Sequence, residues 1–167
     1  FLFMISDFNN LNVFFNSHTA KPLIYKISAA WGNHEGSILL WVLIMNLYSF
    51  IFSFNKSLEK NIKCWIILLQ SLMILGFTLF LLLTSNPFIV KFVDIEEGMG
   101  LNPVLQDPAL AIHPPLLYMG YVGYSIVLSI ALAGLIRNNL NSNLFKVLKN
   151  YSLVCWSFLT MGIGVGA

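Results

Sequence analysis

The sequence is poor in charge. Aspartate, glutamate, lysine and arginine make up 10% of its 167 residues, whereas about 25% is usual in a soluble domain. Apolar residues make up 57%, and the mean hydropathy is +0.78. A soluble core of this length could not bury so much apolar surface, so membrane lipid must be the solvent for much of the chain. The net charge of +2, without a basic stripe, a zinc knuckle or a Gly-Lys phosphate loop, argues against nucleic acid as a partner.

Cysteine and familiar catalytic motifs are also scarce. Cys64 and Cys155 lie in separate apolar runs and form no CxxC pair. We therefore interpret both as small buried hydrophobic residues rather than as redox or metal-binding groups. The sequence shows no Ser/His/Asp set, no HExxH zinc motif and no nucleotide-binding glycine loop. The enzyme classes that depend on these motifs are not indicated.

Long apolar runs predict an all-α, polytopic membrane protein with about four transmembrane helices. The runs cover residues 37–54, 64–83, 114–136 and 151–167. A helix needs about 20 residues to cross about 30 Å of hydrocarbon, so the fourth run is marginal as a span. No acidic or basic residue lies inside these runs. Their absence disfavours a pump or a transporter, which usually needs an ionisable group within the membrane.

The spans divide the chain into four parts. We expect an outer-face N-terminal segment at 1–36, a first helical hairpin at 37–83, an outer-face loop at 84–113 and a truncated second hairpin at 114–167. Six of the nine basic residues follow the first and third spans, and the positive-inside rule places these two loops in the matrix or cytoplasm. All three histidines, His18, His34 and His113, then face the intermembrane space or the periplasm.

The predicted outer-face loop is much longer than the usual connection of about 4–6 residues. It contains three turn signals, Asn86-Pro87, Asn102-Pro103 and Asp107-Pro108, and an acidic, glycine-rich stretch at 96–100. Long loops with fixed turns are usually functional or form docking surfaces. A solvated connector is the alternative.

His113 comes directly before two prolines, Pro114 and Pro115. Because proline is tolerated in the first helical turn, this sequence predicts that a helix begins here and that His113 lies at the membrane rim. A neutral imidazole in such a place could ligate haem iron, with a neighbouring acceptor fixing its tautomer. A single histidine without a partner is a weak signal, and the residues alone favour an exposed capping residue over a ligand.

The Trp31-Gly32-Asn33-His34-Glu35-Gly36-Ser37 stretch precedes the first span. Asn33 is a candidate helix cap, and Glu35 and Ser37 suit the positive N-terminal end of a helix. Trp31 and Trp41 fit an interfacial aromatic role. Only His34 has no evident structural duty, so it stays open as a weak candidate for cofactor binding.

Five motifs in order carry a resemblance to a known family. They are Trp31–Trp41 (WGNHEGSILLW), Thr84–Phe88 (TSNPF), Leu101–Pro108 (LNPVLQDP), His113–Gly123 (HPPLLYMGYVG) and Phe158–Ile163 (FLTMGI). Together they closely resemble the cytochrome c maturation protein F family, in the same order and spacing, over nearly the whole chain.

The resemblance implies the membrane component of a haem lyase. Such a protein holds haem at the outer face while thioethers form between the haem vinyl groups and the CxxCH cysteines of apocytochrome c. By motif match, His113 would be an axial ligand of the haem iron, and the haem would be a transiently held haem b. No chemical role is carried over to His34 or Asp107. The alternative is a non-catalytic structural subunit of a larger respiratory or maturation assembly.

Family members continue beyond the position of Ala167 into a tryptophan-rich WWD segment, a second outer histidine and the histidines that bind an intramembrane haem b. Mitochondrial members are often split, and phenylalanine, at 14 residues, isoleucine and asparagine are abundant here, as in AT-rich organelle genomes. We therefore expect the N-terminal piece of a split haem lyase in the mitochondrial inner membrane. Its expected partners are a WWD-containing chain, apocytochrome c and a haem chaperone or other maturation subunits. Gly162 and Gly166 form a GxxxG pattern that predicts close packing against that WWD-containing chain.

Overall fold

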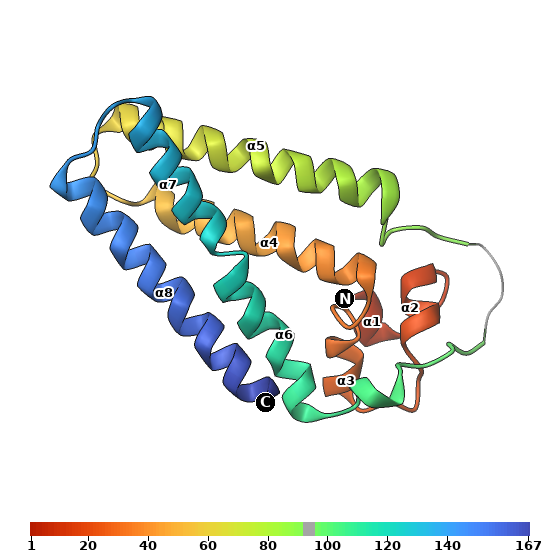
Figure 1. Ribbon diagram of the computed structural model, residues 1–167. Coiled ribbons are helices and arrows are strands. Elements are labelled where there is room, and N and C mark those ends of the chain that lie inside the picture. Colours follow the sequence, from red (N-terminus) through yellow and green to blue (C-terminus); the bar gives the residue numbers. More distant parts are fainter. Residues whose placement is uncertain (92–95) are drawn as a thin grey trace.

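The long apolar runs form a bundle of helices. The computed structural model describes residues 1–91 and 96–167. Residues 92–95 belong to the expected outer-face loop, so that part of the prediction lies outside the described residues. The long helices are α4 (His34–Ser53), α5 (Lys60–Thr84), α6 (Pro108–Tyr121), α7 (Tyr124–Ile136) and α8 (Ser142–Gly166). In Figure 1 α6, α7 and α8 run beside the α4–α5 hairpin.

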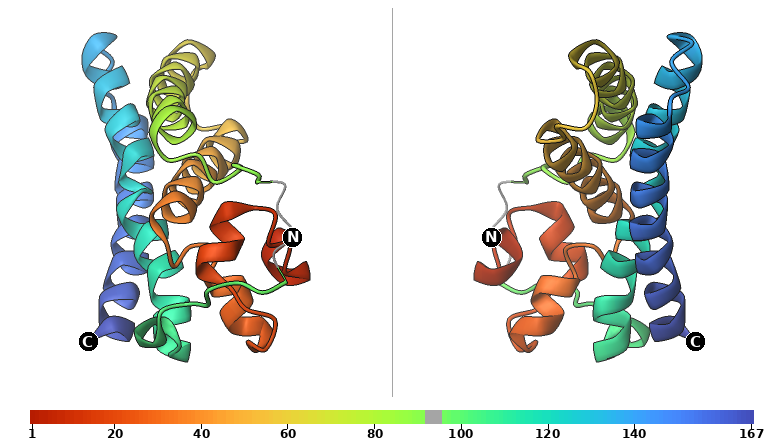
Figure 2. Two further views of the ribbon diagram at one scale, coloured as in Figure 1. Left: turned by 90° about the vertical axis from the view of Figure 1, so that its right-hand side faces the viewer. Right: turned by 90° about the vertical axis from the view of Figure 1, so that its left-hand side faces the viewer.

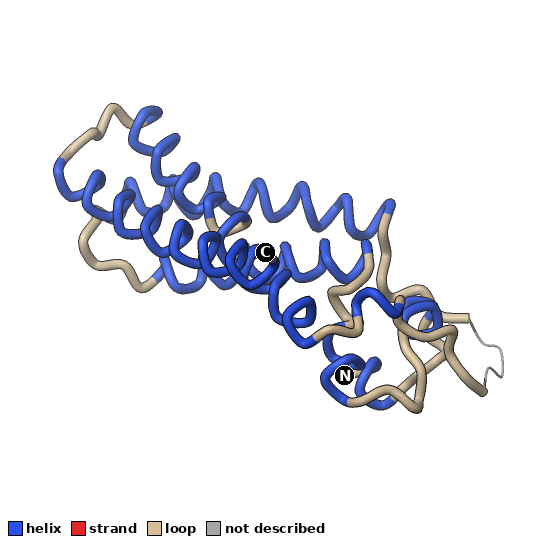
Figure 3. Tube along the Cα trace, turned by 60° about the horizontal axis from the view of Figure 1, so that its bottom comes forward, coloured by secondary structure: helices blue, strands red, loops and turns tan. Residues whose placement is uncertain are grey.

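Short helices gather at one end of the bundle. They are α1 (Leu2–Ile5), α2 (Leu11–Asn16), α3 (Leu23–Ser28) and the 3₁₀ turn η1 (Pro103–Leu105). Figure 3 shows the loops and turns that surround them, and Figure 1 shows that the α4–α5 and α7–α8 connections lie at the opposite end.

Within the described residues, three segments are long and apolar enough to cross a membrane. They are His34–Ser53, Lys60–Thr84 and Ala111–Ile136. α8 is as long as α5, with 25 residues, but its first half carries Lys146 and Lys149. The all-α, polytopic membrane architecture predicted from the apolar runs is therefore confirmed.

The third span differs from its predicted form. It begins at Pro108, where the backbone N–H of Ala109 donates to Asp107 Oδ1 at 2.7 Å, and not at Pro114. It also breaks at Val122–Gly123, where α6 gives way to α7. The prediction that His113 lies just before a helix start was wrong, because Asp107-Pro108 supplies the cap and the first-turn proline instead.

The fourth helix also begins earlier than predicted. The Asn141 side chain accepts a hydrogen bond from the Leu144 backbone N–H at 2.8 Å and so caps α8. In the first turns Leu144 and Val147 are buried, whereas Lys146 and Lys149 are exposed. Because of this polar face, the first turns of α8 do not form an apolar run in the sequence.

A buried polar cluster joins three helices within the bundle. Gln70 on α5 is fully buried, and its Nε2 donates to Ser125 Oγ at 2.9 Å on α7. Ser129 Oγ donates to Gln70 Oε1 at 3.0 Å, and the Met45 carbonyl of α4 lies 3.4 Å from Gln70 Nε2. Apolar residues of α4, α5, α7 and α8 surround this cluster. The hydrogen bonds of Gln70 therefore help to fix how α4, α5 and α7 align with one another.

The two cysteines occupy different environments. Cys155 is buried in the bundle, as predicted. Cys64 is exposed on α5, so the prediction that both are buried was wrong for this residue. The apolar run around Cys64 does not distinguish a face that meets other helices from a face that meets lipid.

Candidate functional site

α6 and α8 pack closely through glycines. The views in Figures 1 and 2 agree that these helices lie side by side. A side chain added to any of three glycines would meet the opposite helix: Gly120 faces Leu159, Gly162 faces Leu117, and Gly166 faces the His113 ring. Small residues at such positions allow two backbones to approach closely in a membrane.

The GxxxG prediction is thereby corrected. Gly162 and Gly166 do mediate close packing, but their neighbour is α6 of the same chain and not a separate WWD-containing chain. The GxxxG pattern indicates close packing but does not identify the partner helix, because it occurs at helix contacts both within one chain and between chains.

The His113 ring is held by this glycine contact. Its Nδ1 lies 2.7 Å from the carbonyl oxygen of Gly162 on α8. A carbonyl only accepts hydrogen bonds, so in the neutral ring the proton is on Nδ1 and the lone pair is on Nε2. Metal-ligating histidines usually have this arrangement, in which the second nitrogen donates to a fixed acceptor. The sequence identified His113 but did not identify Gly162 as its acceptor.

The stretch that precedes the first span forms a rigid, capped turn. The Asn33 side chain accepts from the Gly36 N–H and donates to the Ala29 carbonyl, each at 2.7 Å, so its predicted role as a helix cap is confirmed. Ser37 Oγ donates to the Trp31 carbonyl at 2.8 Å. The Trp31 indole N–H reaches across to α6, where the carbonyl of Ala111 accepts it at 3.0 Å.

His34 is engaged at the open end of the α4–α5 hairpin, away from the connecting loop. Its Nε2 lies 2.9 Å from Ser85 Oγ, and Ser85 is buried although His34 is exposed. This contact joins the start of α4 to the end of α5, and so brings together the WGNHEGS and TSNPF motifs. The sequence had offered no structural duty for His34, and this hydrogen bond supplies one.

Part of the expected outer-face loop is docked on the N-terminal helices. The backbone N–H groups of Met99 and Gly100 donate to carbonyls of Phe14 and Ser17, at 2.8 and 3.1 Å. Gly98 is packed so tightly against this segment that a Cβ would meet the Ser17 carbonyl. For residues 96–100, these contacts show a segment packed on the N-terminal helices of the same chain rather than a solvated connector.

A carboxylate strengthens this docking. Glu97 accepts hydrogen bonds from the hydroxyl and the backbone N–H of Thr19, and His18 Nδ1 lies 3.6 Å from Glu97 Oε1. The hydrogen bonds from Thr19 lower the pKa of the Glu97 carboxyl, with smaller contributions from the Gly98 N–H and from His18. The third histidine therefore lies against an acidic side chain. Across residues 1–91 and 96–167, no three His, Cys, Asp or Glu side chains come together to hold a metal ion.

Comparison with known proteins places these motifs in a family. The family described as "Cytochrome C assembly protein" matches residues 31–167. The chain is 46% identical, over its whole length, to "Cytochrome c-type biogenesis protein CycK" of Rhizobium meliloti and covers 25% of that protein. It is 42% identical over 99% of its length to "Cytochrome c-type biogenesis protein CcmF" of Escherichia coli, and 39% identical over 99% to "Cytochrome c-type biogenesis protein NrfE" of Haemophilus influenzae, covering 26% of each.

The chain thus spans about a quarter of the length of these curated relatives. No solved structure matches it. The family match covers every part of the site described above from Trp31 onward, including the turn before α4, the start of α6 and the glycine-rich end of α8. The chain belongs to the cytochrome c assembly protein family and fits its cytochrome c maturation protein F branch.

Proposed function

We propose that this chain is a membrane subunit of a cytochrome c haem lyase and that His113 provides an axial ligand to haem iron at the outer face. The observation that carries the proposal is the 2.7 Å contact between His113 Nδ1 and the Gly162 carbonyl. This contact places the proton on Nδ1 and the lone pair on Nε2. A neutral imidazole with a free lone pair is the form that binds iron. His113 is half-buried, so its orientation is constrained while part of its surface stays accessible.

The residues present fit one side of a haem site. When bound, the haem (haem b, transiently held) supplies the vinyl groups to which the cysteines of apocytochrome c become attached. This chain orients the ring of His113, and through it any bound ligand, so that its contribution is one of positioning. His34 stays a weaker candidate, because its Nε2 lies against Ser85 Oγ.

The proposed site needs residues outside this sequence. Since the chain spans about a quarter of its relatives, we propose that a WWD segment faces His113 from the rest of the same polypeptide or from a partner chain in a split enzyme. Apocytochrome c and further maturation subunits, among them a haem chaperone, complete the proposed assembly. The names of the relatives, which are cytochrome c-type biogenesis proteins, support apocytochrome c and maturation subunits as partners.

We place the chain in the mitochondrial inner membrane, with His113 facing the intermembrane space. The abundance of phenylalanine and the resemblance to split mitochondrial family members support that membrane, although the relatives named above are bacterial proteins. The clustering of six of the nine basic residues at 56–63 and 137–149 supports the orientation. A cysteine introduced at Asn143 should be labelled from the matrix side of mitoplasts only. Labelling from the outer side would refute the orientation.

The haem assignment is tested by replacing His113. In the membrane complex that contains this chain, His113→Ala should lower bound haem and cytochrome c output while the chain still accumulates. His113→Gly with added imidazole should restore part of the haem, because imidazole can occupy the vacated ligand position. His18→Ala is the matched control and should keep its haem, since His18 lies against Glu97 and not against α6 or α8.

Normal haem loading and cytochrome c output in His113→Ala would overturn the proposal and would favour the structural subunit. His34→Ala, measured in parallel, separates the two candidate ligands. Loss of haem in His34→Ala with wild-type haem in His113→Ala would move the ligand role to His34.

A further inference from the structure

The carbonyl of Ala111 has no donor in its own helix. In an α-helix it would accept from the N–H of the residue four positions on, and in a 3₁₀ turn from the residue three positions on. Those residues are Pro115 and Pro114, and neither carries an N–H. Ala111 is 4% exposed, so water does not readily replace the missing donors. A buried backbone acceptor of this kind must find a donor elsewhere in the protein.

Trp31 supplies that donor. Its indole N–H points at the Ala111 carbonyl from outside the helix, at 3.0 Å. The ring is mounted on the turn between α3 and α4, where Ser37 Oγ holds the Trp31 carbonyl and the Trp31 N–H donates to Ser28 O. The backbone that carries the donor is therefore held by contacts of its own, which do not involve α6.

Ala111 lies two positions before His113, so this bond fixes the segment that carries the histidine. On the other side of the segment, the His113 ring meets the Gly162 carbonyl and Gly166. We infer that Trp31 is a positioning residue for His113. Trp31 holds the first turns of α6 in place through its hydrogen bond to the Ala111 carbonyl. The hydrogen bond stands on geometry alone, whereas its consequence for haem rests on the proposed function.

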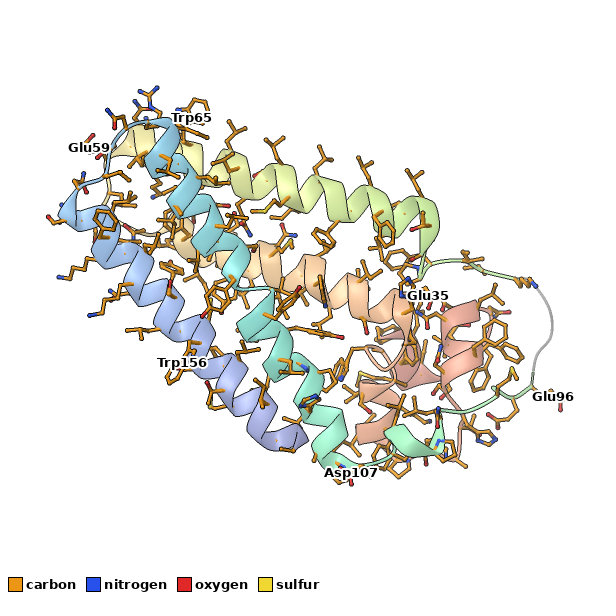
Figure 4. The ribbon with its side chains drawn as sticks, in the orientation of Figure 1. Glu35, Glu59, Trp65, Glu96, Asp107 and Trp156 are labelled. Atoms are coloured by element: carbon orange, nitrogen blue, oxygen red, sulfur yellow. The ribbon has the colours of Figure 1, made fainter. Side chains whose placement is uncertain are left out.

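The experiment is a double-mutant cycle on the complex that contains the full chain. Trp31→Phe keeps an aromatic ring but removes the N–H donor. Pro115→Ala gives the Ala111 carbonyl an N–H at the normal helical position, so the external donor is no longer needed. Trp156→Phe is the matched control, because Trp156 on α8 is 58% exposed and points away from the bundle (Figure 4).

Two readouts are compared across the cycle: haem retained after transfer to haem-free buffer, with its absorption spectrum, and the thermal midpoint of the haem-free complex. Trp31→Phe should retain haem at least about fivefold less well, since leaving a buried acceptor unpaired has an effect of that order. Its spectrum should move toward that of a weaker axial ligand, and added imidazole should reverse part of the change. In the Pro115→Ala background the same replacement should change retention by less than about twofold.

If Trp31 acts only by ring packing or by anchoring at the membrane interface, Trp31→Phe should lower haem retention equally in the wild-type and Pro115→Ala backgrounds. That result would overturn the inference. If Trp31→Phe alone does not accumulate, recovery of the chain by Pro115→Ala supports the inference, and failure to recover it contradicts it. If His113→Ala keeps its haem, the proposed function fails, and the thermal midpoints alone then decide whether the two positions are coupled. If His113→Ala loses its haem but the cycle is additive, the proposed function stands and the inference fails.

Discussion

Replacing Gly162 with alanine should force α6 and α8 apart. A Cβ at this position would lie 2.8 Å from the backbone nitrogen of Leu117 and 3.0 Å from its Cα. Backbone atoms in the middle of a helix cannot rotate away as the end of a flexible side chain can. The strain is therefore relieved only by separating the helices, which also lengthens the contact from His113 to the Gly162 carbonyl.

The change in stability caused by Gly162→Ala follows from two opposing effects. Overpacking a close contact costs about 1–3 kcal/mol, whereas exchanging glycine for alanine within a helix gains up to about 1 kcal/mol. Gly164 provides the matched control, since it lies on the same helix and a Cβ there would meet nothing within 4 Å. The gain in helix propensity is shared by both variants and cancels. Gly162→Ala should therefore be less stable than Gly164→Ala by about 1–3 kcal/mol.

Reversible unfolding of the chain in mixed micelles, titrated with SDS and followed by tryptophan fluorescence, measures this difference. Gly164→Ala should unfold at the wild-type midpoint or above it, and Gly162→Ala at a clearly lower midpoint. The packing argument would be refuted by equal midpoints for the two variants, because the close approach of α6 and α8 at Leu117 would then not exist.

Two further predictions concern the buried polar cluster around Gln70 and the segment at 96–100. Gln70→Leu should lower the free energy of unfolding by about 1–2 kcal/mol in the same titration, because it removes the interhelical hydrogen bonds to Ser125 and Ser129; an unchanged midpoint would contradict this role. The pKa of Glu97 is lowered in the folded state, so its stabilisation of the docked loop should be complete above the unfolded-state pKa and be lost as the pH falls through the folded-state pKa. Protease cleavage near residues 96–100 should rise over that acidic range. The Glu97→Gln variant should be cleaved readily at neutral pH, and its cleavage rate should depend little on pH.

The helices were predictable to the extent that they are apolar. The runs at 37–54 and 64–83 match α4 and α5 closely, because both helices are apolar for most of their length and on most of their faces. The start of α6 was misplaced because Pro114 was taken as the first-turn proline. Asp107-Pro108 carries the same signal more fully, with an acceptor at the cap followed by a proline, and the Asp107 side chain does accept from Ala109.

The site was predictable only as single residues. His113 stands out by its prolines and its motif, and those same prolines imply that the Ala111 carbonyl lacks a donor. The sequence does not reveal which distant residue supplies the donor. The contacts from Trp31 to Ala111 and from Gly162 to His113 depend on how α3, α6 and α8 meet in the folded chain.

The first span and the turn before it fix both ends of α6. Trp31, just before α4, donates to the Ala111 carbonyl near the start of α6, and Tyr48, within α4, donates to the Met119 carbonyl near its end at 2.7 Å. Both acceptors lie where the helix is irregular: the first beside two prolines, and the second next to the break at Val122–Gly123. In hydrocarbon an unsatisfied carbonyl costs several kcal/mol, so these irregularities are tolerable because the α4 region supplies the donors. The break separates α6 from α7, so the short helix that carries His113 is held by a donor near each of its ends.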